Sequence, residues 1–522
     1  MSVGGRCISQ YFQRKPDARR SLRGATRSYQ LAPRSVRGTC ERAVSKITSG
    51  SIQLVMVLLL AIGLGSGCND FLTVDSEDQL SRAELFSTVR GADAAVVGLY
   101  QQLTELYDYR YPIYADLSGN TVAPLVDLPA GNALIATQRG LLQLRNRTVT
   151  PELANTGLPA FYDRAYRILF QAADILDGLA LVQDGQAAQL SSLSAEARTI
   201  RALVHFELLR LFAQAPGFTS DGSHPGVVLI DEPPNIFNQP ARASVAEGYA
   251  FIRNELALAA SGIDERFSVR SGGPVWVNAA VVQGLSARVA AYATDWPAVV
   301  EAATIATDEA NTSLTPATEY VAQWRTGALS ETLWQLDLQQ RLEGLDDDDV
   351  FNTTATLIGS RNPRPVLGVS EELLGLFSPG DLRRGLYVAN EAGTVGSAKW
   401  PLDTGALVNP TLLRLSDLYL LRAEAFVELG ELALAADDYL AVRQRALPGA
   451  AAPELTATAL REAIRTERRL ELAFENHHFF DLGRWGLGVP AVGLVYPDDR
   501  FVLPLPDEAL LLNPSLLQNA GY

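Results

Sequence analysis

The fold is decided by one stretch near the C-terminus, Arg465-Thr-Glu-Arg-Arg-Leu-Glu-Leu-Ala-Phe-Glu-Asn-His-His-Phe-Phe-Asp-Leu-Gly-Arg-Trp485. Its apolar residues recur at helical spacing: Leu470, Leu472, Ala473 and Phe474. Three carboxylates fall four residues apart and therefore share one helix face: Glu467, Glu471 and Glu475. Like charges repel, so they need counter-charges, and the nearest are Arg465, Arg468, Arg469 and Arg484. The stretch predicts a salt-bridge network that specifies the fold, with catalytic carboxylates as the alternative.

This stretch resembles the signature of the SusD/RagB family, which reads roughly Glu-Arg-Arg-Leu-Glu-Leu-Ala-Phe-Glu-Gly-His-Arg-Phe-Phe-Asp-Leu-Arg-Arg-Trp-Gly. The chain departs from it at Asn476, His478 and Gly483. Two further stretches are similar to the family's last helices and chain end: Arg414–Ala425, and Leu503–Ala509 with Asn513–Tyr522. The resemblance runs from Cys68 to the last residue. It implies a mainly α, SusD-like fold, in which tetratricopeptide-like helix pairs form a scaffold around an inserted loop-rich region with short strands.

The hydrophobic periodicity independently predicts paired helices along the chain. The expected segments are 84–107, 158–181 with 194–214, 244–262 with 276–293 and 295–310, and 411–429 with 431–447 and 459–476. Small residues recur where such helices must approach closely, for example Ala287, Ala290 and Ala291. This is the helix-turn-helix pattern of tetratricopeptide units, although their 34-residue consensus is absent.

The N-terminal region has the layout of a secretory signal. An uncharged apolar run, Ile52 to Leu64, follows Arg42 and Lys46 and ends at Gly65-Ser-Gly-Cys68. The run is too short for a permanent membrane span, so we expect Cys68 to be lipidated after cleavage. Residues 1–67 are then a removed leader whose unusual length indicates a misassigned start codon. The remainder, 68–522, is expected to be one domain, with an N-terminal part of about 68–310 and a C-terminal part of about 311–522.

The charge of the remaining chain excludes several classes of partner. Residues 1–67 hold 11 of the 44 basic and 2 of the 59 acidic side chains, which leaves a net charge of −24 from Cys68 onward. Nucleic acids and anionic membrane surfaces attract proteins through Lys and Arg, so neither is an expected partner. Cys68 is the one cysteine after the leader, so acylation there excludes disulfides, a thiol nucleophile and cysteine metal sites. Lys399 is the one lysine after the leader, which we interpret as codon bias.

A tyrosine-rich segment is the first candidate ligand site. The stretch from Tyr107 to Asn120 lacks a helical period and is predicted to be a loop, and loops on a rigid scaffold often carry binding residues. Aromatic faces bury the apolar faces of sugar rings, while carboxylates and amides hydrogen-bond the hydroxyls. The alternative is that the tyrosines pack the loop against the preceding helix. The candidate ligand residues are Tyr107, Tyr109, Tyr111, Tyr114, Asp116 and Asn120.

A second candidate ligand residue is Trp324, in the stretch from Tyr320 to Trp334. No metal is expected at His477 and His478, because adjacent helix positions point about 100° apart. The run Asp346 to Asp349 offers oxygen ligands for calcium, but it lacks EF-hand spacing and is more simply explained as a solvated charge run. No catalytic motif and no cofactor motif stands out, although the paired carboxylates of a glycosidase need only meet in space.

The resemblance implies a function in nutrient uptake and no enzymatic activity. A SusD-like protein is a surface-exposed outer-membrane lipoprotein that captures an oligosaccharide, or a peptide, and passes it to a SusC-like TonB-dependent transporter. Two other classes stay open. One is a helical-repeat interaction scaffold without a ligand, and the other is an exported glycosidase. The sequence does not name the ligand.

Overall fold

The computed structural model describes residues 80–117, 121–122, 158–233, 235, 237–264, 270, 273–338, 368–391, 393–400, 409–490 and 493–522, with backbone alone at 108–117 and 121–122. The leader, the apolar run Ile52 to Leu64 and Cys68 lie outside these residues, so the predictions made for them stay predictions. Residues Glu77–Tyr522 form one compact unit. Among the described residues, no helix combines the length and the apolar character needed to cross a membrane.

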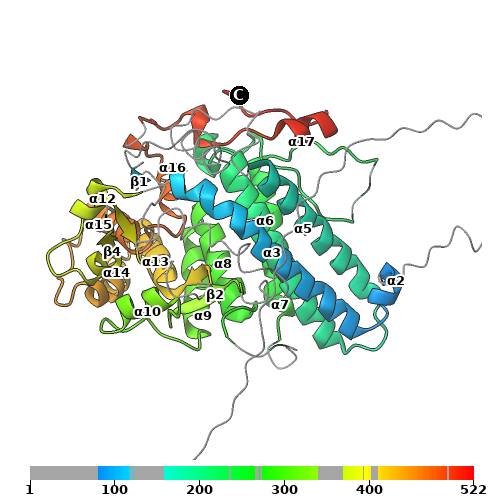
Figure 1. The fold of residues 1–522 in the computed structure, drawn as a ribbon, viewed down its shortest axis with the longest axis horizontal. Helices are drawn as coiled ribbons and strands as arrows, with labels where there is room; N and C mark the ends of the chain where they lie inside the picture. Colours follow the sequence, from blue (N-terminus) through cyan, green and yellow to red (C-terminus); the bar gives the residue numbers. More distant parts are fainter. Residues whose placement is uncertain are drawn as a thin grey trace, which may run out of the picture. The chain divides into compact units, whose positions relative to one another are not determined.

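The N-terminal half of the unit is a series of antiparallel helices (Figure 1). Each long helix packs against the next along the chain, from α3 through α9. This nearest-neighbour stacking is how tetratricopeptide-like repeats bury their apolar faces. The helices are α2 (Arg82–Leu85), α3 (Val89–Leu117), α5 (Leu158–Gly178), α6 (Ala187–Phe212), α7 (Val245–Gly262), α8 (Ala279–Tyr292) and α9 (Trp296–Asp308).

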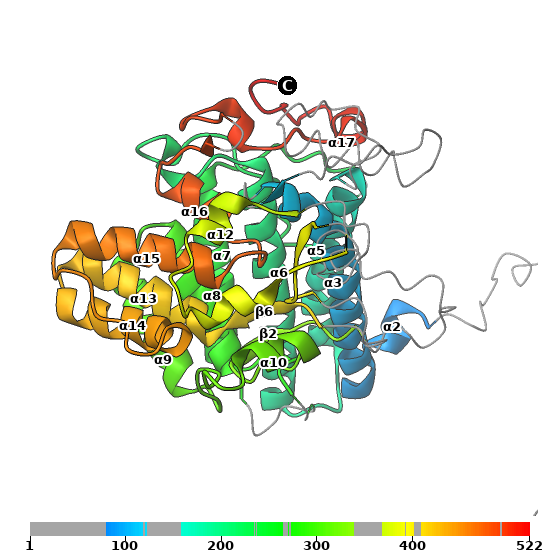
Figure 2. The same cartoon turned by 60° about the vertical axis from the view of Figure 1, so that its left-hand side comes forward.

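The C-terminal half continues this stack after an irregular insertion. Helix α13 packs against α8 and α9, and α14 and α15 pack against α13. Figure 2 shows these three helices side by side, in yellow to orange. The described helices here are α10 (Tyr320–Thr326), α12 (Glu371–Gly375), α13 (Leu415–Leu429), α14 (Leu432–Ala446), α15 (Ala457–Glu471), α16 (His478–Arg484) and α17 (Asp507–Leu512), with short 3-10 turns at Leu179–Leu181, Pro216–Phe218, Leu382–Leu386 and Asp499–Phe501.

The described strands form three antiparallel two-stranded ribbons. β1 (Thr121–Val122) pairs with β3 (Gly368–Val369), β2 (Thr332–Gln335) with β6 (Thr411–Arg414), and β4 (Tyr387–Ala389) with β5 (Val395–Ser397). The β2–β6 ribbon packs against α8. It approaches so closely that a Cβ atom on Gly284 of α8 would lie 2.4 Å from the Leu413 side chain. Glycine at this position therefore allows the ribbon to dock on the helical stack.

The helix boundaries follow local sequence rules. Ser81 with Glu84 and Ser244 with Glu247 form capping boxes at the starts of α2 and α7. Asn476 has a φ of +68° just after α15. This is the position at which the family run has glycine, and asparagine is the non-glycine residue that best tolerates left-handed backbone.

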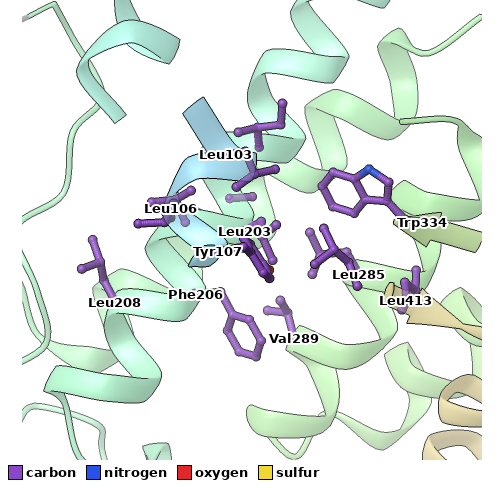
Figure 3. Close-up of a cluster of buried hydrophobic side chains, with 14 of the residues drawn as sticks. Leu103, Leu106, Tyr107, Leu203, Phe206, Leu208, Leu285, Val289, Trp334 and Leu413 are labelled. Atoms are coloured by element: carbon purple, nitrogen blue, oxygen red, sulfur yellow. The ribbon is translucent and has the colours of Figure 1, made fainter. Parts of the chain in front are cut away.

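The central core joins both halves of the unit (Figure 3). Side chains from α3, α6, α8, β2 and β6 meet there, and all are nearly inaccessible to solvent. Such a core needs all five elements at once, because each presents only one apolar face. Its labelled members are Leu103, Leu106, Tyr107, Leu203, Phe206, Leu208, Leu285, Val289, Trp334 and Leu413.

The mainly α fold with paired helices is confirmed, and most predicted helices agree with the structure to within a few residues. Two differences stand out. Residues 411–414, predicted as the start of a helix, form strand β6. The predicted loop from Tyr107 to Asn120 is wrong as far as residue 117, because α3 continues to Leu117. The boundary at Cys68 and the division near residue 310 stay predictions.

Candidate functional site

The three glutamates of the signature lie in a buried ionic cluster, here called the Glu471 cluster. Glu471 is fully buried and accepts hydrogen bonds from Arg414 at 2.7 Å, Arg383 at 3.0 Å and the Tyr320 hydroxyl at 3.0 Å. The cluster balances five carboxylates with five cations. Its members are Glu331, Asp381, Glu467, Glu471, Glu475, Arg383, Lys399, Arg414, Arg443 and Arg445.

The cations of the Glu471 cluster lower the pKa values of Glu471 and Glu331 against the opposing effect of burial. Burial alone raises the pKa of Glu471, but Arg445, Arg414 and Arg383 together hold that pKa well below its usual range. Burial lowers the pKa of the Lys399 ammonium, and the neighbouring Glu475 carboxylate offsets this in part. Lys399 donates to the carbonyl oxygens of Glu471 and Ala473 and to Glu475. Lys399 therefore holds the chain that leaves α15 in place.

A second group of buried ion pairs connects the signature to α8 and α13. It is here called the Arg468 cluster, and its positive and negative charges are equal in number. Arg468 bonds Asp417 at 3.0 Å and Asp481 at 3.0 Å, and its side chain is 1% exposed. The pKa of Asp481 is lowered, because Arg468 and Arg484 outweigh the opposing effect of burial. The members in order of contact are Arg288, Asp417, Arg468, Asp481, Arg484 and Glu424.

These two clusters confirm the predicted salt-bridge network but correct its partners. Arg465 pairs with Glu462, and Arg469 pairs with Glu372 on the surface. The signature glutamates are neutralised instead by cations from four places: the 3-10 turn Leu382–Leu386, the residues just after β5, strand β6 and helix α14. Desolvation offsets much of the attraction within an intact buried pair, whereas removal of one partner leaves an uncompensated buried charge. Their carboxylates are engaged by neighbouring cations, so the arrangement joins elements rather than supplying a free acid or base.

Trp324, the second predicted ligand residue, lies against the Glu471 cluster. Its side chain is 4% exposed, and the Lys399 ammonium and the Arg414 guanidinium lie 4.6 Å and 5.5 Å from its ring centroid. A small pocket of about 10 Å³ lies beside it, between Leu329 and Trp400. Two cations already contact this ring, so Trp324 is a packing residue in this structure and not an exposed platform for a sugar.

A wider hollow lies on the other side of the turn that follows α10. It is here called the β2 groove, and it is bounded by residues 273–280 at the start of α8, 309–312 after α9, and 327–335 in the turn and β2. Its volume is about 630 Å³, and it is open to solvent. Gly327, with a φ of +69°, reverses the chain after α10 and so forms one wall. This volume lies within the range of pockets that bind small molecules.

The floor of the β2 groove is apolar and its walls carry hydroxyl and amide groups. Leu329, Leu333 and Ala280 are buried beneath it. Thr332 and Gln335 are its polar residues on β2. Sequence reasoning missed these residues. They come from three segments spread over sixty positions, and no cluster of motif-forming side chains marks them in the sequence.

The tyrosine-rich segment lies partly in the core. Tyr107 is 1% exposed and packs with Leu103 and Leu106 (Figure 3). It is therefore a core residue and not part of a surface platform. The side chains of Tyr109, Tyr111, Tyr114 and Asp116, and the whole of Asn120, lie outside the described part, so their predicted role stays a prediction. Because residues 107–117 are helical, positions 107, 111 and 114 follow the spacing of one face and position 109 does not.

Within the described residues, no group of three or more His, Cys, Asp or Glu side chains is arranged to hold a metal ion. His477 is buried and His478 is half-buried, and desolvation lowers the pKa of His478 to about 3. The acidic run from Asp346 to Asp349 lies outside the described residues.

Comparisons with known proteins identify relatives over most of the chain. A family model described as "SusD family" matches residues 403–498, and one described as "Starch-binding associating with outer membrane" matches residues 95–271. The first range contains the signature and the second covers much of the N-terminal stack. A SusD-like protein of Formosa agariphila is 23% identical over 542 aligned positions, which cover 90% of this chain and 99% of that protein.

Solved structures share the fold. A SusD superfamily protein of Bacteroides thetaiotaomicron superposes with a TM-score of 0.72 at 22% identity, covering 83% of this chain and 99% of that one. A SusD-like carbohydrate-binding protein of Bacteroides vulgatus superposes with a TM-score of 0.69 at 16% identity, covering 82% and 97% respectively. At such identities the likeness concerns the fold and does not transfer individual site residues.

Proposed function

This chain belongs to the SusD/RagB family, and from that premise we propose that it captures a nutrient oligosaccharide at the outer membrane. In this proposal the protein is anchored through lipidated Cys68, faces outward, and passes its ligand to a SusC-like TonB-dependent transporter. Peptide is the second ligand class.

The observation that carries the proposal is the family match over residues 95–271, whose description names both starch binding and the outer membrane. The fold supports it, because the superposition covers 99% of a SusD superfamily protein. The charge also supports it. A net charge of −24 after the leader disfavours nucleic acid and is compatible with neutral ligands.

A binding role is favoured over catalysis by the state of the signature charges. The carboxylates of the Glu471 and Arg468 clusters are paired with buried cations. A glycosidase needs one carboxyl group with a raised pKa beside a second that stays ionised. In contrast, the pKa values of Glu471 and Glu331 are both lowered.

The experiment is a binding screen of the full-length protein against oligosaccharides and peptides, followed by calorimetric titration of any ligand found and by chromatography of the ligand after long incubation. Binding of an intact oligosaccharide is the expected result. Binding of the transporter without any ligand would favour the interaction scaffold, and release of shorter products would favour the glycosidase. Either of these two results would overturn the proposal.

A further inference from the structure

The β2 groove contains a buried hydroxyl group with no partner. Thr332 is 6% exposed, and its Oγ1 atom has no hydrogen-bond partner among the described residues. Buried polar atoms in proteins are almost always paired, so an exception in a solvent-connected hollow calls for an explanation. Less than 1 Å² of this oxygen is accessible, so a molecule in the groove that Thr332 lines supplies the missing partner only if the side chain rotates toward it.

Three amide groups surround the same hollow. The backbone N–H of Gln335 donates to the carbonyl of Pro274 at 2.7 Å, which fixes this residue at the groove edge. Its side-chain amide, and that of Asn311, have no hydrogen-bond partner among the described residues. The Asn278 Oδ1 atom accepts the N–H of Val281 at the start of α8, which leaves its Nδ2 group as a donor. The groove therefore offers both donors and acceptors.

The charge of the lining is also informative. Glu309 is its charged residue, and the described lining holds no lysine or arginine. Proteins recognise carboxylate, sulfate and phosphate groups chiefly through arginine, lysine or free backbone N–H groups. At the start of α8 the Asn278 side chain already accepts one N–H, that of Val281, and the helix end carries only a partial positive charge. An acidic ligand would meet Glu309 without a counter-charge.

From these observations we propose that the β2 groove is a binding site for a neutral, polyhydroxylated chain, with the Thr332 hydroxyl and the Gln335 amide as direct contacts. Sugar hydroxyls donate and accept at once, as hydroxyl and amide groups do, so the two sets match without any net charge. The apolar floor formed by Leu329 and Leu333 receives the C–H faces of the rings. This inference rests on the proposed function and deepens it, because it names the site and the class of sugar.

The first test blocks the groove. Ala328 is an exposed residue of its wall, so Ala328→Trp adds a large side chain at the groove. The matched control is Ala322→Trp, at an exposed position on α10 that does not line the groove. With full-length protein and maltoheptaose, cellohexaose and laminarihexaose as probes, Ala328→Trp is expected to weaken the binding of the bound probe at least tenfold. Ala322→Trp is expected to leave it within twofold.

The second test removes the unpaired hydroxyl. Thr332→Val preserves the shape of the side chain, and deleting an unpartnered buried polar group is expected to leave the melting temperature unchanged or raised. The same change is expected to weaken the binding of the oligosaccharide probe about five- to tenfold. A lower melting temperature with unchanged affinity would show that this hydroxyl has a structural partner, and it would remove Thr332 from the site.

The third test compares charges. Wild-type protein is expected to bind a neutral hexasaccharide at least tenfold more tightly than hexagalacturonic acid. Tighter binding of the acidic chain would overturn the neutral-ligand inference. If no oligosaccharide binds the wild type, the proposed function itself fails. If one binds and Ala328→Trp behaves like Ala322→Trp, the groove inference fails while the proposed function stands.

Discussion

Arg468 and Arg469 are adjacent in the sequence but occupy opposite environments, so the pair of substitutions Arg468→Met and Arg469→Met tests the ionic network directly. The Arg468 side chain is 1% exposed and bonds two buried carboxylates, Asp417 and Asp481. The Arg469 side chain is 16% exposed and pairs with Glu372, which is 59% exposed. Both substitutions remove one positive charge and retain an unbranched side chain.

The expected magnitudes differ by several fold. Without Arg468, the Arg468 cluster carries one uncompensated negative charge in the interior, and breaking a buried pair in this way costs about 3–5 kcal/mol. Without Arg469, the loss is that of a partly solvated pair, which is under about 1 kcal/mol. Unfolding entropy of about 2 cal/mol/K per residue, summed over the unit Glu77–Tyr522, converts these values to a lower Tm of about 3–5 °C for Arg468→Met and about 1 °C or less for Arg469→Met.

The assay is urea unfolding followed by far-ultraviolet circular dichroism, with thermal melts as a second measurement. Neither substitution is expected to change the affinity of a bound oligosaccharide, because both side chains lie outside the β2 groove. The reasoning is refuted if Arg468→Met is as stable as the wild type. It is also refuted if Arg469→Met lowers the free energy of unfolding more than Arg468→Met does. In that case burial would not decide how much an ion pair contributes to stability.

Three further predictions concern acid stability, the tyrosine segment and the anchor. Burial lowers the pKa of His205 to about 3, and its Nε2 atom accepts the N–H of Ile230, which only the neutral ring allows. The folded pKa of His205 lies below its unfolded value of about 6.5, so protonation of this ring favours the unfolded state. The free energy of unfolding is therefore unaffected by His205 above pH 6.5, and it decreases as the pH falls toward 3 by at most about 1.4 kcal/mol per pH unit. Urea unfolding at pH 7 and pH 5 measures this loss, and a loss of the same size in His205→Gln would contradict the assignment. Tyr107→Ala is expected to destabilise the core by about 3–5 kcal/mol in the same assay. Tyr109→Ala, off the helix face of Tyr107, is expected to preserve the fold and weaken calorimetric binding by about 1–2 kcal/mol, and unchanged affinity would exclude Tyr109 from the ligand platform. Cys68→Ala is expected to move the protein from the detergent phase to the aqueous phase in Triton X-114 partitioning, and a mature N-terminus upstream of Cys68 in mass spectrometry would exclude lipidation there.

Local patterns in the sequence determined the helical architecture of this protein. Apolar residues that recur every three to four positions define a helix wherever it packs, so the segments at 158–181, 244–262 and 431–447 were predictable from their own residues. The signature stretch predicted buried ion pairs for a similar reason, since three glutamates on one helix face need cations nearby. The same rule did not predict the last part of α3. Polar and aromatic residues follow Leu106 and Tyr107, so the helical period is not visible there in the sequence.

The partners of those charges and the location of the groove were decided only by the tertiary structure. Glu471 is neutralised by Arg383, Arg414 and Arg445, which come from three different elements. Nothing local in the sequence favours them over the nearby Arg465 or Arg469, because ion pairing depends on distance in space. In the same way, Asn278, Asn311 and Thr332 meet around one hollow only because α8, the end of α9 and β2 pack together. Local periodicity fixes which face of an element is buried, whereas the long-range packing of those faces fixes which polar groups come together.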